Sequence, residues 1–74
     1  MDIAQLIEKL SSKAAWFRME VTNKTAQDFF GYPKRYRVAL SPLTWRQKPL
    51  EAFGDTPLEA LVELDKMVEA ANGL

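Results

Sequence analysis

FGDTPLEALVELDKMVEAANG, residues 53–73, carries the signals of a helix and of both its ends. Thr56 is placed to cap the helix, and Pro57 has the fixed φ that suits a first helical residue. Glu59 follows the cap by three residues, so its side chain can reach back to a free backbone amide. Gly73 supplies the left-handed residue at which helices often stop. The sequence therefore predicts a helix that begins at Thr56 or Pro57.

One broad side of this predicted helix is apolar. Its apolar residues recur at steps of three and four, which places them on one side of a helix. They are Leu58, Leu61, Val62, Leu64, Met67, Val68 and Ala71, while Glu59, Glu63, Lys66 and Glu69 fall mainly on the other side. The rest of the chain is therefore expected to cover this apolar side.

The chain has 74 residues, 47% of them hydrophobic and 27% charged, which fits a single globular domain over residues 1–74. It contains no cysteine, so a disulfide framework is excluded and a reducing cytoplasm is the simplest compartment. No apolar run approaches the ~20 residues that a membrane-spanning helix needs. We therefore expect a folded cytoplasmic protein without a membrane-spanning segment.

The segments before this helix predict a second helix and three strands. Asp2 can cap a helix whose apolar stripe is Ile3, Leu6, Ile7 and Leu10. From Trp16 the period changes to two, and Phe17, Met19 and Val21 are expected on the buried face of a strand. Residues 35–41 predict another strand, with Tyr36, Val38 and Leu40 on one face and Arg35, Arg37 and Ala39 on the other.

A tight turn is expected at residues 41–43, because Pro42 cannot continue a central ladder. The third strand, residues 44–53, is interrupted by Pro49, which favours a sheet edge or a bulge. The predicted fold class is thus α+β, in the order α-β-β-β-α. Both amphipathic helices need a surface to cover, so we expect them on one face of a three-stranded antiparallel sheet.

Residues 23–34 are predicted to form a long connection between the first two strands. Phe29, Phe30 and Tyr32 lie close together in it. One interpretation is that Phe29 or Phe30 folds back over the end of the sheet as a lid. The alternative is an exposed aromatic contact site for a partner.

The net charge is zero, but the charges are unevenly distributed along the chain. Residues 16–50 carry a net charge of +5, and residues 51–74 carry −5. By alternation, the face of the sheet away from the helices should hold a basic, partly aromatic group of side chains. They are Trp16, Arg18, Arg35, Arg37, Arg46 and Lys48. This face is either an ordinary solvated surface or a docking face for phosphates or carboxylates.

The chain lacks the residues that most enzyme sites use. Histidine and cysteine are absent, which removes the usual general base, thiol nucleophile and soft-metal ligands. The glycines are scattered, so they cannot form a phosphate-binding loop. We therefore expect no catalytic, cofactor or metal site.

Two resemblances can be stated. The order α-β-β-β-α resembles the double-stranded-RNA-binding domain, a family that uses a basic start of its last helix, where this chain has the acidic stretch DTPLE. GDTPLEAL, residues 54–61, is similar to the strand-to-helix junction of HicB-type antitoxins and of short phage and prophage reading frames. The second resemblance implies a small, often dimeric regulatory or inhibitory binder.

We expect a non-enzymatic binding module, of phage or prophage origin, that engages an anionic nucleic acid or protein surface through the basic sheet face. A second hypothesis is a homodimer joined through the third strand or the aromatic loop. A third is charge mimicry, in which Glu59, Glu63 and Glu69 imitate phosphates toward a nucleic-acid enzyme.

Overall fold

The computed structural model describes residues 2–43 and 48–72. The terminal helices come before and after the strands in the chain, and a short helix separates the first two strands. In chain order they are α1 (Ile3–Ser12), β1 (Ala14–Val21), α2 (Lys24–Phe30), β2 (Tyr36–Pro42), β3 (Leu50–Gly54) and α3 (Pro57–Asn72). The three strands form one antiparallel sheet in the order β1-β2-β3.

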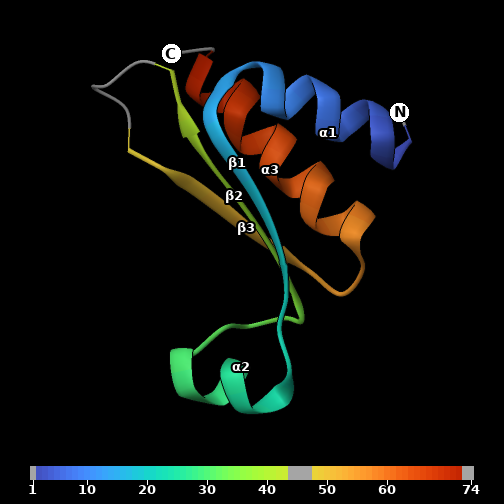
Figure 1. Ribbon diagram of the computed structural model, residues 1–74, viewed down its shortest axis with the longest axis vertical. Helices are drawn as coiled ribbons and strands as arrows, with labels where there is room; N and C mark the ends of the chain where they lie inside the picture. The colour runs from blue at the N-terminus through green and yellow to red at the C-terminus, as the bar shows by residue number, and fades with distance from the viewer. Residues whose placement is uncertain (1, 44–47, 73–74) are drawn as a thin grey trace.

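Helices α1 and α3 lie on the same face of this sheet, and α2 lies beyond one end of it (Figure 1). This confirms the predicted α+β fold with both amphipathic helices on one face. The core between the layers is almost entirely aliphatic. It consists of Leu6, Leu10, Val38, Leu40, Ala52, Ala60, Leu61, Leu64 and Val68.

Both terminal helices begin at the predicted caps. The N–H of Gln5 donates to Asp2 Oδ1 at 2.8 Å, and the Gln5 side chain accepts from the Asp2 amide. In α3 the N–H of Glu59 donates to Thr56 Oγ1, but the Glu59 carboxylate accepts from the amide of Asp55, one residue before the expected donor. The predicted stop at Gly73 lies outside the described residues.

Salt bridges from Lys9 join the two terminal helices. Lys9 Nζ lies 3.0 Å from Asp65 Oδ1 and 3.2 Å from Glu69 Oε1. Hydrogen bonds to Asp65 and Glu69 raise the pKa of Lys9 above its ordinary value. The first and last helices therefore contact each other through charge as well as through apolar packing.

Strand β1 is less buried than its alternating pattern predicts. Phe17 is half-buried, but Met19 and Val21 are 39% and 65% exposed, so the expectation that both are buried is wrong. The reason is position: β1 is an edge strand, and the longer helix α3 packs on β3 and β2 rather than on β1. The same face of the central strand is buried at Val38 and Leu40.

The connections around the prolines also differ from expectation. Strand β2 continues through Pro42, which pairs with Ala14 beside an irregularity in the ladder, so the predicted turn at residues 41–43 is wrong. Strand β3 begins only at Leu50, directly after Pro49. The first part of the predicted third strand, residues 44–47, lies outside the described residues.

Candidate functional site

The face of the sheet opposite the helices, which we call the open face, is lined by residues from all three strands. The register pairs Trp16 with Ser41, Arg18 with Ala39 and Glu20 with Arg37 across β1 and β2. It pairs Ala39 with Glu51 and Arg37 with Phe53 across β2 and β3. Since directly paired residues share a face, acidic and basic side chains are mixed there.

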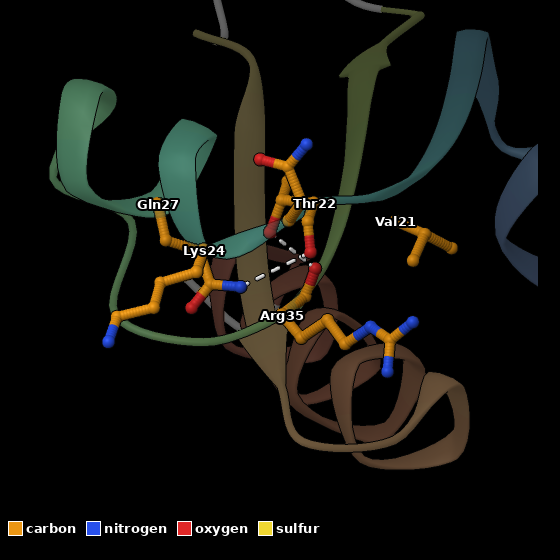
Figure 2. A pocket seen from close by; sticks show the side chains of 6 residues that line it. Val21, Thr22, Lys24, Gln27 and Arg35 are labelled. Carbon is orange, nitrogen blue, oxygen red and sulfur yellow. Dashed lines mark hydrogen bonds between the residues drawn. The ribbon is translucent and has the colours of Figure 1, made fainter.

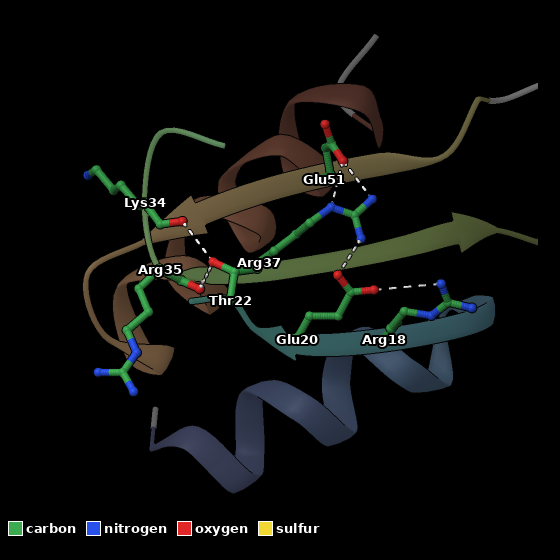
Figure 3. A network of polar contacts seen from close by, with 7 residues as sticks. All are labelled: Arg18, Glu20, Thr22, Lys34, Arg35, Arg37 and Glu51. Atoms are coloured by element: carbon green, nitrogen blue, oxygen red, sulfur yellow. Dashed lines mark hydrogen bonds and ion pairs between the residues drawn. The ribbon is translucent and has the colours of Figure 1, made fainter. Parts of the chain in front are cut away.

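Arg37 lies at the centre of an ion-pair network on the open face (Figure 3). Its Nη2 is 2.8 Å from Glu51 Oε2, and its Nη1 is 3.2 Å from Glu20 Oε2. Arg18 adds a longer contact of 3.7 Å to the other oxygen of Glu20. The four side chains carry two positive and two negative charges, so the network is neutral.

The surroundings of Arg37 stabilise its charged form. Burial alone would lower its pKa, but the hydrogen bonds that Arg37 donates to Glu51 and the charges of Glu20 and Glu51 outweigh this effect and raise the pKa. The guanidinium carbon also lies 5.6 Å from the centre of the Tyr32 ring, within the range of a cation–π contact. Arg37 is thus committed to contacts within the protein.

The structure brings together only part of the predicted basic site. Trp16, Arg18 and Arg37 share the open face, whereas the Arg35 guanidinium points away from the Arg37 network (Figure 3) and lies over the Tyr36 ring. Lys48 is exposed in the segment before β3, and Arg46 lies outside the described residues. The sequence prediction did not include Glu51. Its position beside Arg37 depends on the β2–β3 register, which no local sequence pattern indicates.

Residues 24–30, predicted as part of a connection, form helix α2. Asn23 caps it by accepting a hydrogen bond from the Ala26 N–H at 2.8 Å, and Gly31 ends it with a left-handed φ of 72°. The sequence thus contains two helix signals, an Asn at the start of this segment and a Gly after its end. The helix is short and none of its residues is buried. Its sequence therefore lacks the apolar stripe by which an amphipathic helix is recognised.

Thr22 attaches α2 to the end of the sheet (Figure 2). It is a buried polar residue whose Oγ1 donates to the carbonyl of Arg35 at 2.6 Å, while Gln27 Nε2 donates to the Thr22 carbonyl at 3.2 Å. These bonds join the strand that leads into α2, the helix itself and the strand that follows. A shallow recess beside them is lined partly by Lys24 and Arg35.

Four aromatic rings run from α2 onto the open face, and we call them the aromatic ridge: Phe29, Phe30, Tyr32 and Phe53. Phe29 and Phe30 meet edge to face with centres 4.9 Å apart, and Phe30 stacks on Tyr32 at 5.4 Å. Tyr32 then packs on Phe53 of β3 at 5.3 Å. Tyr32 therefore covers the sheet, whereas Phe29 and Phe30 remain 81% and 62% exposed.

Neither a metal centre nor a membrane span is found in residues 2–43 and 48–72. No three carboxylate side chains there are arranged to hold a metal ion. The described helices also lack the combined length and hydropathy that crossing a bilayer requires.

Comparison with known proteins gives no match: no family model fits the chain, and no curated protein or solved structure is significantly similar to it. The resemblances to double-stranded-RNA-binding domains and HicB-type antitoxins therefore stay predictions. The open face and the aromatic ridge are the surface features that bear on function.

Proposed function

We propose that this chain is a non-enzymatic protein-binding module whose contact site is the outer part of the aromatic ridge, Phe29 and Phe30. The observation that carries the proposal is their exposure of 81% and 62% on a helix that contributes nothing to the core. Leaving two adjacent large apolar side chains in water gives no folding benefit, and such patches mark interaction sites. Aromatic anchors also contribute much of the binding energy in protein interfaces.

The ridge is presented in a fixed geometry. The capping bond of Asn23 and the left-handed Gly31 set both ends of α2, and the Thr22 bonds hold it to the strands. The stacking of Tyr32 on Phe53 extends this support to β3. A preorganised ridge loses little side-chain entropy on binding, which favours affinity.

The charges of this chain favour a protein over a nucleic acid as its partner. On the open face Arg37 is paired with Glu20 and Glu51, so the predicted gathering of free cations is not present among the described residues there. The face of Phe30 is already stacked on Tyr32, which reduces the ring area available to a base. A polyanion would thus find few free charges on the open face.

Cations near α2 define the partner more closely. Lys24 and Arg35 line the recess beside the helix, and neither takes part in the ion pairs of the described residues. An apolar hollow with an acidic rim on a partner protein would fit the ridge and these cations. The proposal thereby keeps the predicted anionic partner but moves the contact site from the open face to α2.

The charge-mimic alternative has less support, because acids of α3 are engaged within the protein. Asp65 and Glu69 contact Lys9, and Glu63 contacts Lys66 at 3.3 Å. A cytoplasmic location and a phage or prophage origin belong to the proposal as well. Their support is the cysteine-free sequence and the GDTPLEAL junction at residues 54–61.

The test places a photo-crosslinking phenylalanine analogue at position 29 and identifies the crosslinked species in a nuclease-treated lysate. We expect one protein crosslink, lost when Phe30→Ala is combined with the label. The matched control carries the analogue at Leu43, which is 68% exposed and follows β2 at the other end of the sheet. Equal crosslinking from both positions, or crosslinks to nucleic acid that disappear with nuclease, would refute the proposal.

A further inference from the structure

Strand β1 has a free edge. The order β1-β2-β3 leaves it with one neighbour, and its eight residues make it longer than β3, which has five. Within the described part of the chain, β1 packs mainly against β2 and α1, and no strand pairs with its outer edge. A free edge of this length can accept another strand through backbone hydrogen bonds.

The ladder shows which residues offer those bonds. The Thr22 N–H donates to the Arg35 carbonyl at 2.8 Å, one step beyond the Val21–Tyr36 pair. In an antiparallel ladder only every second residue bonds to a given neighbour. The residues of β1 in phase with Thr22 therefore bond toward β2, and the intervening ones direct their N–H and C=O outward. The outward set is Phe17, Met19 and Val21.

We infer that two copies of this chain pair antiparallel along their β1 edges, about a two-fold axis at Met19, to form a continuous six-stranded sheet. A two-fold contact needs a self-complementary surface. In this register Arg18 of each copy lies opposite Glu20 of the other, on the open face. Met19 meets Met19, and Phe17 meets Val21, all through outward backbone groups.

The charges select this register over its neighbours. Moving the axis to Arg18 would place the two Arg18 side chains directly opposite each other, and moving it to Glu20 would do the same for the two glutamates. Like charges opposite each other destabilise a strand pair, whereas opposite charges stabilise it. Among these adjacent registers, only the one centred on Met19 pairs both charges favourably.

The apolar side of the strand agrees with the same register. Met19 and Val21 are 39% and 65% exposed in the single chain, although Val38, which pairs with Met19 on the central strand, is buried. In the pair, each Val21 lies against Phe17 of the second copy, and the two Met19 side chains lie against each other. The second copy thereby covers apolar side chains that the edge position of β1 leaves exposed in the single chain.

The first test uses charge reversal and sedimentation equilibrium over a wide concentration range. The native chain should form a dimer, and Arg18→Glu and Glu20→Arg should each be monomeric where the native chain is dimeric. Mixed in equal amounts, the two variants should form a heterodimer, because every facing pair is again of opposite charge. A native chain that is monomeric throughout, or a mixture that stays monomeric while both variants are folded by circular dichroism, would overturn the inference.

A second variant does not depend on charge. Met19→Pro removes an outward N–H and leaves the β1–β2 ladder intact, since proline is tolerated at the outer side of an edge strand. Dimer formation should be lost, whereas Met19→Ala, which keeps the N–H, should retain part of it. A Met19→Pro variant that still forms the native dimer would place the interface elsewhere. Phe29→Ala should leave the dimer unchanged, which separates this test from that of the aromatic ridge.

Discussion

The covered face of the sheet and the aromatic ridge use apolar side chains in opposite ways. On the covered face Leu10, Leu61 and Leu64 are completely buried between helices and strands. On α2 two larger side chains, Phe29 and Phe30, are mostly exposed, although they stack in a defined order. The comparison indicates that aliphatic layers stabilise the fold and that exposed aromatics leave its stability almost unchanged. Substitutions can test this division.

The largest effect is expected for Leu61→Ala. This side chain is fully buried in the core, and its truncation removes apolar contacts and leaves a cavity. The free energy of unfolding should fall by about 2–5 kcal/mol, measured by urea denaturation. Leu58→Ala on the same helix, at a 41% exposed position, is the control. Similar losses for the two variants would contradict the importance of the covered face.

The next effect is expected for Gly54→Ala, where β3 meets α3. A Cβ on Gly54 would clash with the backbone nitrogen of Ala60 and lie 2.9 Å from the Thr56 carbonyl oxygen. Since both are backbone atoms, the strand and helix must separate, at a cost of about 1–3 kcal/mol in thermal or urea unfolding.

Gly31→Ala gives a useful comparison for that substitution. Its Cβ would meet nothing within 4 Å, but its φ of 72° is unfavourable for alanine, so a loss of about 1–2 kcal/mol is expected. The loss should be local to the end of α2. Faster hydrogen exchange in β3 and α3 of Gly31→Ala, but not of Gly54→Ala, would contradict this distinction between the two glycines.

A smaller effect is expected for Arg37→Met. The change removes the cation between Glu20 and Glu51 and leaves two carboxylates on the open face. Because the network is partly exposed to solvent, the loss of stability should be only about 1 kcal/mol, and it should shrink as salt is added. Arg18→Met, which removes the 3.7 Å contact to Glu20 and the exposed cation–π contact with Trp16, should cost less than Arg37→Met when both are measured at concentrations where the chain is monomeric. Equal losses of stability in Arg37→Met and Arg18→Met that do not change with salt would contradict a stabilising role for the ion-pair network.

The smallest effect on stability is expected for Phe29→Ser. The ring is 81% exposed, so the unfolding free energy should change by no more than about 0.5 kcal/mol. Thermal unfolding of this variant beside Leu61→Ala measures the contrast between the two regions directly. A large loss would mean that the ridge stabilises the fold and would remove its exposure as an argument for binding.

Local signals predicted most of the fold. The caps at Asp2 and Thr56 and the regular spacing of apolar residues indicate α1 and α3 without knowledge of the rest of the chain. The alternation of Tyr36, Val38 and Leu40 likewise indicates a strand, which the structure places between the other two. The exposure of Met19 could not be predicted, because alternation identifies the face of a strand and not its place in the sheet.

The candidate site was harder to predict, because it depends on contacts between distant segments. The neutralisation of Arg37 requires the register that brings Glu20 and Glu51 beside it, and no short-range pattern encodes that register. The sequence did show that Phe29 and Phe30 were unusual in a loop. It could not show that Tyr32, rather than either phenylalanine, would cover Phe53.

The packing of α3 has a consequence for how the protein folds during synthesis. This helix supplies Ala60, Leu61, Leu64 and Val68 to the core, and its Asp65 binds Lys9 of the first helix. A nascent chain that has reached only β3 therefore has a sheet whose apolar side is largely bare. Such partly folded chains are prone to aggregate, so the interval before α3 emerges from the ribosome is when this protein would most need a chaperone.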